Sequence, residues 1–394
     1  MIRILADTII TPYRRAAGAI DCMDGRIASL GDPGPAAPHS LFDLRGLTVT
    51  PGLIDLHVHG GGGHSFWSDR PNEILSATQF LGRHGITALC PTVAFLQDRL
   101  DDTDKRRLDA MSAAICSPEP APQILGLHLE GPYASQDYPI LPDQPLLTPA
   151  PSAYRAFFGY SDHILRCTLS PHSAQSIELV SYLVGRGIYP SIGHACASFE
   201  DVCKAYEAGA HHITHIYSSM NSVYRTNGTR QMGILESAFA LDGMDVEMIA
   251  NGKHLSDDLM RLIIKLKTPE HICVVSDANE YSGHPDGPVT YLGYEGYIQD
   301  GVILRKDGKG FLGSTTTSDQ MLRHLVKRTG VSIQDAIRMC ATTPARSVGF
   351  GGRKGVLSPG YDADIIAFDD EINIRFVMAR GEVLYCSDDL SQNR

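Results

Sequence analysis

The sequence contains no apolar run of the roughly 18 residues that a membrane-spanning helix needs, so we predict no membrane segment. Its first residues, Met1–Asp7, reach an acidic side chain too early for a secretory signal peptide. The nine cysteines are scattered, odd in number and form no Cys-x-x-Cys pair. This cysteine usage indicates reduced thiols, and we predict a cytoplasmic protein.

Positive charge is also scarce. The 34 Lys and Arg residues are outnumbered by 45 Asp and Glu, the formal net charge is −11, and no basic stripe is evident. This charge balance argues against a nucleic-acid-binding protein. Apolar residues make up 43% of the chain, and 38 glycines are typical of an α/β enzyme with many turns. A chain of 394 residues can bury a large core, enough for one barrel and a smaller second domain.

Two histidines close an apolar run near the start of the chain. The stretch 50–60 reads TPGLIDLHVHG and carries His57 and His59. On a β-strand, residues i and i+2 point to the same face, so both imidazoles could reach one ion where the strand ends. The glycine run 60–63 then leaves room for a ligand to approach. Taken alone, the pair fits two satisfied polar residues at a strand end equally well.

The same pattern recurs further along the chain, with helix-like stretches between the β-prone runs. These runs cover 124–130, 188–194, 211–215 and 271–277, and each ends in an imidazole or a carboxylate. In a (β/α)8 barrel, the C-terminal ends of the strands meet at one mouth. Four imidazoles and two carboxylates suit one or two divalent transition metals, with Zn, Fe, Co and Mn all left open. We therefore predict that six residues converge: His57, His59, Glu130, His194, His215 and Asp277.

Both ends of the chain show short strand-like runs. In residues 1–50 these are divided by turn signals such as Asp24-Gly25, and a similar texture begins at Gly355–Leu357 and continues to 386. A small β-sandwich built from both termini would cover its own apolar faces. We predict that residues 1–50 and 355–394 form this domain and that 51–354 form the barrel. The Pro-rich segment 134–152 is predicted to be a loop over the barrel mouth.

Several motifs carry a resemblance to a known family. They are PGLIDLHVHGGGG at 51–63, HLEGPY at 128–133, SIGHACAS at 191–198, THIYSSM at 214–220, NGKH at 251–254, SDA at 276–278 and ATTPARSVG at 341–349. In this order, and over nearly the whole chain, they resemble the amidohydrolase superfamily, and within it the N-acetylglucosamine-6-phosphate deacetylase family. The resemblance implies an α/β fold: a metal-dependent (β/α)8 barrel with a small β-sandwich domain built from both termini.

The resemblance also implies roles for the six residues. His57, His59 and Asp277 would serve one metal position, His194 and His215 the other, and Glu130 would lie between them. Asp277 would be the catalytic acid/base, taking a proton from the attacking water and giving it to the departing amine. Because the chain retains the His-x-His pair, which some relatives lack, two ions can be accommodated.

By the same resemblance, the substrate is an N-acetylated amino sugar, most closely N-acetylglucosamine-6-phosphate, and the enzyme is a homodimer. Substrate-binding positions map to Ser218, Ser219, Arg230 and His254. The chain departs from the family at Ser218-Ser219, where the family has Asn-Ala, and residues 134–150 lack the Lys-Gly-x-His that follows HLEGP. These departures weaken the expectation of a 6-phosphate more than the expectation of hydrolysis.

Other functions stay open at this point. One is a different amidohydrolase, such as an N-acyl-amino-acid deacylase or a cyclic amidase. Relatives of the dihydroorotase type often use a carboxylated lysine as the bridging ligand, so Glu130 argues against them. The other is a non-catalytic paralogue with a binding role, against which the retention of all six ligand-type residues argues.

Overall fold

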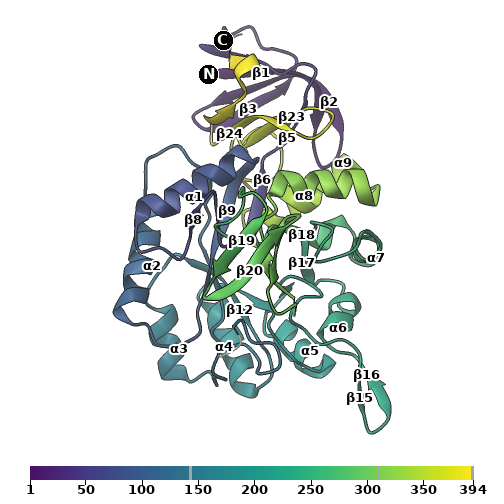
Figure 1. The fold of residues 1–394 in the computed structure, drawn as a ribbon. Coiled ribbons are helices and arrows are strands. Elements are labelled where there is room, and N and C mark those ends of the chain that lie inside the picture. Colours follow the sequence, from purple (N-terminus) through teal and green to yellow (C-terminus); the bar gives the residue numbers. More distant parts are fainter. Residues whose placement is uncertain (142–143, 309, 392–394) are drawn as a thin grey trace.

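The computed structural model of the protein describes residues 1–141, 144–308 and 310–391. Residues 392–394, the end of the predicted terminal domain, lie outside the described ranges. Figure 1 shows a helix-covered barrel with a β-rich unit at one end, and that unit contains both the first strand, β1, and the last described helix, α11. Among the described residues, no helix has the length and apolar character that crossing a membrane requires.

The barrel consists of eight parallel strands that pair in chain order, as predicted. The backbone N–H of Asp277 donates to the carbonyl of His57 at 2.9 Å, which joins the end of the last strand to the first. A short strand, β10 (Gln123–Ile124), pairs with β9 outside this path. The barrel strands are β6 (Leu53–Val58), β9 (Ile86–Ala94), β11 (Leu127–Glu130), β12 (Ile164–Leu169), β13 (Tyr189–Ile192), β14 (His212–Ile213), β17 (Asp245–Ile249) and β18 (Ile272–Val275).

Helices lie between the strands and cover the outside of the barrel (Figure 1). They form because one face of each is apolar; α7, for example, buries Met260 and Ile263. Its first turn is stabilised by Ser256, whose hydroxyl accepts the N–H of Leu259. The barrel helices are α1 (Pro71–Arg83), α2 (Asp102–Ile115), α3 (Pro151–Phe158), α4 (Ala174–Gly185), α5 (Phe199–Glu207), α6 (Ile234–Ala240), α7 (Asp257–Lys267), α8 (Ser318–His324), α9 (Ile333–Ile337) and α10 (Thr343–Ser347). A short helix, α11 (Asp388–Ser391), follows the last strand of the terminal β domain.

The terminal strands form one sheet in the order β25-β24-β23-β5-β1-β2-β3. Strand β1 pairs with β4 over its first half and with β5 over its second half, so the sheet divides there around a core of its own. This arrangement confirms a separate β domain built from both termini. The strands are β1 (Ile2–Ile10), β2 (Arg15–Met23), β3 (Arg26–Gly31), β4 (Ser40–Asp43), β5 (Thr48–Pro51), β23 (Ile365–Phe368), β24 (Ile374–Ala379) and β25 (Glu382–Cys386).

The predicted strand at Gly355–Leu357 is wrong, because this segment is a turn. Gly355 has a φ of +78°, and a Cβ there would lie 2.6 Å from the carbonyl oxygen of Ala341. The hydroxyl of Thr342 donates to the Gly355 carbonyl at 2.7 Å. Gly355 therefore packs against Ala341 and Thr342, whereas the side chain of Leu357 is buried in the core of the terminal domain without pairing in its sheet.

Among the described residues, three small antiparallel sheets lie outside the barrel and terminal sheets, and none of them was predicted. The largest is a four-stranded sheet that follows β18 and lies across the barrel in Figure 1. The Asp300-Gly301 turn within it, with φ of +51° and +84°, is a hairpin signal that the sequence did offer. The strands are β19 (Gly287–Tyr291), β20 (Tyr294–Gln299), β21 (Val302–Arg305) and β22 (Phe311–Ser314), with hairpins β7 (Gly60–Gly61)–β8 (His64–Ser65) and β15 (Tyr224–Thr226)–β16 (Thr229–Gln231).

A buried lysine joins the barrel to the terminal sheet. Lys354 is fully buried, and its Nζ lies 2.7 Å from Asp364 Oδ2 and 3.1 Å from Asp362 Oδ2. The carbonyl of Asp364 accepts the N–H of Gly52 at 3.0 Å, between β5 and β6. Asp362 also pairs with Arg353 at 3.1 Å, but Lys354 is the only cation near the buried Asp364 among the described residues, so removing the ammonium group would leave that carboxylate without its cation.

We therefore expect Lys354→Met to lower the free energy of unfolding by about 3–5 kcal/mol, measured by urea denaturation. Lys306→Met is the control, because it breaks an ion pair with Glu295 that is exposed on both sides. That control should leave the denaturation midpoint nearly unchanged. Similar shifts in the two variants would contradict the linking role of Lys354.

Candidate metal centre and active site

The six predicted residues lie together at the C-terminal ends of the barrel strands. Each is the last residue of its strand or lies within two residues of its end. Three of them, His194, His215 and Asp277, have positive φ values of +48°, +28° and +47°. Left-handed backbone in non-glycine residues costs on the order of 1–3 kcal/mol and persists where the surroundings hold it. The strands thus end in strained turns that carry these three side chains into the mouth.

Glu130 lies between two groups of histidines. Its Oε1 is 3.1 Å from Nε2 of both His194 and His215. On the other side, His57 Nε2 is 3.5 Å from Oε1 and His59 Nε2 is 3.5 Å from Oε2. These contacts form two three-residue groups with ligand-type geometry, and both include Glu130.

Asp277 borders the group of His57 and His59. Its Oδ1 lies 3.2 Å from His59 Nε2 and 3.5 Å from His57 Nε2. Its side chain keeps 16% of its surface exposed, whereas that of His57 is fully buried. Asp277 therefore touches the histidine group and also faces open space.

The charges in this cluster depend on one another. Burial disfavours ionisation of Glu130, but His57, His194 and His215 hold the pKa of this carboxyl well below its usual range. Burial likewise opposes protonation of His57, yet Glu247 and Glu130 hold the pKa of this imidazole well above its usual range. Positive charge in the middle of the cluster thus stabilises the buried carboxylates.

The residues fit a divalent metal. His57 Nε2 is buried with no hydrogen-bond partner, and Nε2 of His194 faces Nε2 of His215 at 3.1 Å. Facing ring nitrogens next to a carboxylate are the donor set of borderline transition-metal ions. The structure thus places all six predicted residues around a space suited to such an ion.

A cavity of about 830 Å³ opens above this cluster. Its walls come from the strand ends, from the loop segment Asp137–Leu141 and from the β19–β22 sheet. The loop predicted at 134–152 thus contributes to the mouth, although residues 142–143 lie outside the described ranges. Ser218, Ser219 and His254 also line the cavity, so the structure brings these three predicted substrate-binding residues to the metal cluster.

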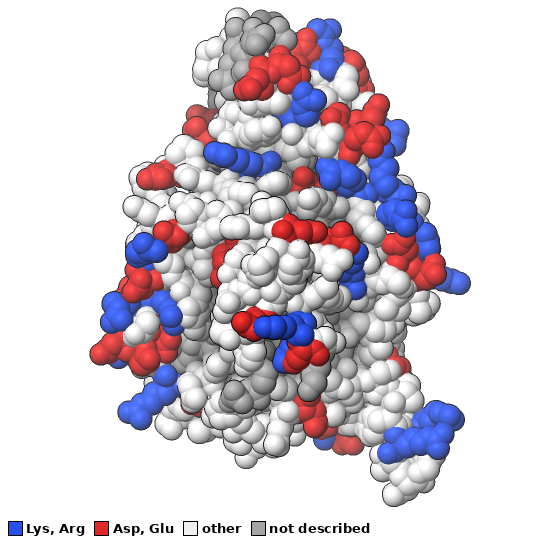
Figure 2. Space-filling view, viewed as in Figure 1, with Lys and Arg blue, Asp and Glu red and all other residues white. Residues whose placement is uncertain are grey.

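Arg230 is the predicted substrate-binding residue that the structure does not bring to the cavity. It pairs with Arg225 across the β15–β16 hairpin and is exposed. The hairpin projects from the barrel in Figure 1, and Figure 2 shows a patch of positive charge on part of its surface. The sequence pattern around Arg230 could not show that the β15–β16 hairpin projects away from the barrel.

Arg305, on β21, is the one Lys or Arg among the described residues that lines the cavity, and sequence analysis missed it. Its guanidinium is held by the Asp307 carboxylate, at 3.0 Å through Nε and 2.6 Å through a terminal nitrogen. The same group lies over the ring of Tyr294, 5.5 Å from its centroid. A cation is therefore fixed on the roof of the cavity.

His254 is oriented by Asn251. The Asn251 carbonyl oxygen accepts the backbone N–H groups of Lys253 and His254, both at 3.0 Å. This turns the amide nitrogen toward His254 Nδ1, also at 3.0 Å. Burial lowers the pKa of His254, so the ring is neutral, and with Nδ1 accepting a hydrogen bond its Nε2 carries the hydrogen. His254 can therefore donate a hydrogen bond to a ligand in the cavity.

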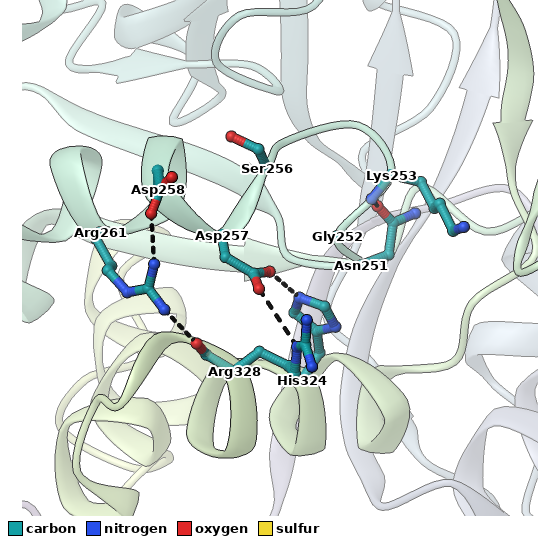
Figure 3. Close-up of a pocket in the computed structure, with 9 residues that line it drawn as sticks. All are labelled: Asn251, Gly252, Lys253, Ser256, Asp257, Asp258, Arg261, His324 and Arg328. Carbon is teal, nitrogen blue, oxygen red and sulfur yellow. Dashed lines mark hydrogen bonds and ion pairs between the residues drawn. The ribbon is translucent and has the colours of Figure 1, made fainter.

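A second hollow, of about 570 Å³, lies near Asn251 but outside the cluster (Figure 3). Its charged side chains pair with one another: Asp257 lies 2.8 Å from His324 and 3.3 Å from Arg328, and Asp258 lies 2.6 Å from Arg261. None of the six clustered residues lines this hollow. We therefore place the active site at the barrel mouth.

Comparison with known proteins agrees with this site. Residues 48–384 match the amidohydrolase family. The chain belongs to the amidohydrolase family. N-acetylgalactosamine-6-phosphate deacetylase of Escherichia coli O157:H7 is 28% identical over 91% of this amidohydrolase and 93% of its own length. N-acetylglucosamine-6-phosphate deacetylase of Bos taurus is 30% identical over 87% of this chain and 85% of its own length.

Solved structures of amidohydrolases share the fold. A mutant of N-acetyl-D-glucosamine-6-phosphate deacetylase from Mycobacterium smegmatis, in complex with N-acetyl-D-glucosamine-6-phosphate, matches with a TM-score of 0.86 and 25% identity. The match covers 98% of this chain and 99% of that chain. The agreement extends over both the barrel and the terminal β domain, and confirms the predicted fold class.

The two groups should not hold metal equally well in this amidohydrolase. Contacts in the group of His194 and His215 are 3.1 Å, against 3.5 Å between His57 and Glu130. We expect His194→Ala to remove more bound metal than His59→Ala, measured by elemental analysis of the purified proteins. His172→Ala removes a half-buried imidazole outside both groups and should leave the metal content unchanged. A reversed ranking would contradict the assignment.

Proposed function

We propose that this amidohydrolase is a metal-dependent deacetylase of an N-acetylated amino sugar, most closely N-acetylglucosamine-6-phosphate or an analogue. The observation that carries the proposal is the pair of histidine groups that share Glu130 beside Asp277 at the floor of a cavity. The relatives support the substrate class, because the matched proteins from Escherichia coli and Bos taurus are both deacetylases of N-acetyl amino sugar phosphates.

The reaction would split the amide C–N bond with water. The hydroxyl part of water adds to the acyl carbon, one proton goes to the departing nitrogen, and acetate and the free amino sugar leave. A divalent ion held by the histidines and Glu130 would act as a Lewis acid that polarises the carbonyl and lowers the pKa of water to about 7. The other tasks fall to residues of the chain.

Asp277 is suited to moving the proton. Burial opposes its ionisation, but His59 and His57 hold the pKa of this carboxyl below its usual range. The ionised carboxylate can therefore accept a proton from water and give it to the amine, which regenerates it. Because Asp277 lines the cavity, it can reach both partners.

The remaining polar groups can orient the sugar. His254 would donate its Nε2 hydrogen to a sugar hydroxyl or to the acyl carbonyl. Ser218 and Ser219 line the same cavity and offer hydroxyl groups, whereas the backbone N–H of Ser218 already donates to the carbonyl of His215 at 2.9 Å. We retain the homodimer and the cytoplasmic location as predictions from the sequence.

The test of the function is amine release from a panel of N-acetylated sugars, with and without a 6-phosphate, after metal has been restored to the protein. We expect hydrolysis of at least one N-acetyl amino sugar and its loss after chelation. Full activity of a preparation shown to be free of metal would contradict the metal-dependent mechanism. Hydrolysis of N-acyl amino acids or cyclic amides alone would favour the alternative amidohydrolases.

Asp277→Asn should lower kcat by ~10²–10⁴, because the amide keeps the shape of the side chain but cannot accept the proton. Substrate binding should persist, and metal content should be measured in parallel. Asp137→Asn is the control, since Asp137 is another carboxylate that lines the cavity but lies outside both histidine groups. Near-normal turnover in Asp277→Asn with its metal retained would exclude the acid/base role.

If the substrate carries a phosphate, Arg305 is placed to bind it, because a guanidinium can offer two hydrogen bonds to phosphate oxygens. Arg305→Ala should then lower kcat/KM for a phosphorylated substrate roughly ten- to a hundred-fold and leave the unphosphorylated analogue nearly unchanged. Arg230→Ala, made in parallel, should have little effect if the phosphate contact comes from within one chain. A selective loss in Arg230→Ala would instead require the hairpin of a second chain to reach the cavity.

A further inference from the structure

Glu247 lies in the interior of the barrel and is fully buried. It belongs to β17, a strand that supplies none of the six clustered residues. Its Oε2 accepts a hydrogen bond from His57 Nδ1 at 3.0 Å and another from the backbone N–H of His215 at 3.0 Å. A single carboxylate oxygen thus contacts one histidine of each group.

Arg166 balances the charge of Glu247. This arginine is 1% exposed, and its Nη1 lies 2.7 Å from Glu247 Oε1. The same nitrogen donates to the carbonyl of Leu56 at 2.8 Å, the residue directly before His57. Glu247 is therefore a charged and fixed acceptor.

This acceptor decides which nitrogen of His57 can bind metal. Because Nδ1 of His57 donates its hydrogen to Glu247, Nε2 is the ring nitrogen that can give up its proton to bind an ion. Nε2 is buried without a hydrogen-bond partner and lies 3.5 Å from both Glu130 and Asp277. A carboxylate behind a metal-binding imidazole fixes the ring orientation and raises the basicity of the ligand.

Glu247 also fixes the backbone beside His215. Its side chain accepts the N–H of His215, and its own backbone carbonyl accepts the N–H of Ile216 at 2.9 Å. These two bonds hold the turn in which His215 has its positive φ. The ring of His215 is thereby directed to Glu130, 3.1 Å from its Nε2.

We propose that Glu247 is a positioning residue that couples the two metal positions. It holds the ring of His57 with Nε2 turned toward Glu130 and Asp277, and it holds the strained turn that presents His215. An ion at either position therefore meets a histidine that the same side chain has already oriented. The proposal rests on the metal dependence of the proposed function, but not on the identity of the substrate.

The test is the zinc affinity of Glu247→Gln, measured by competition with a chromophoric chelator. Loss of the orienting carboxylate should raise the dissociation constant roughly ten- to a hundred-fold. Asp245→Asn is the matched control, since Asp245 is a buried carboxylate on the same strand that also pairs with an arginine and a histidine, Arg346 at 2.8 Å and His271 at 2.8 Å. It should lower stability and leave zinc affinity unchanged, and an equal loss in both variants would overturn the proposal.

Glu247→Gln leaves Arg166 buried without its partner, so the variant can fail to fold. Replacing both residues together, with Glu247→Met and Arg166→Met, removes the pair without leaving an unpaired charge. This double variant should show the same loss of zinc affinity. Affinity equal to that of the parent protein would overturn the proposal.

A His57→Ala background separates the two contacts of Glu247. There, Glu247→Gln should cause a smaller further loss of zinc affinity, because only the contact with His215 remains. If Glu247→Gln lowers zinc affinity as much in this background as in the parent protein, the role toward His57 is overturned. If zinc affinity does not fall at all in this background, the role toward His215 is overturned. If the parent protein binds zinc and Glu247→Gln binds it with the same affinity, only the coupling is refuted. If the parent protein binds no divalent metal, the proposed function is refuted as well.

Discussion

The active site depends on one buried carboxylate, Glu130, which four imidazoles contact at once. Out of water, neither the carboxylate nor a charged imidazole is stable alone, so each holds the other in place. The barrel makes this contact possible, because its strand ends bring side chains from distant parts of the sequence to one mouth. A divalent ion strengthens the same attraction and would replace the protons that otherwise supply the positive charge.

Sequence analysis could find the six clustered residues because each closes a short β-prone run, which is a local signal. It could not find Glu247, although the run 245–249 places a charged residue in the middle of a buried strand. The meaning of that charge depends on Arg166 and His57, which meet it only when the barrel closes. Arg305 was missed for a similar reason, since the sheet that carries it acquires its place over the mouth through tertiary packing.

Substrate recognition was harder to predict than metal binding. Arg230 matches an arginine position in the family pattern, yet the hairpin carries it away from the cavity of its own chain. The Gly355–Leu357 strand failed because a positive φ and a close backbone neighbour matter more there than apolar composition. In both cases the deciding factor is the direction in which a turn sends the chain. The residue types along the sequence specify that direction only weakly.

The segment that carries the roof sheet leaves the barrel at Ala278 and returns at Ser314, and these two residues are paired beside Asp277. The N–H of Ser314, its last residue, donates to the Asp277 carbonyl at 3.1 Å, and the N–H of Asn279 donates to the Ser314 carbonyl at 3.1 Å. An insertion whose two ends are tied together can change in length and sequence with little strain on the strands below it. Evolution can thus remodel the roof of the cavity while Asp277, the carboxylate proposed to transfer the proton, keeps its position.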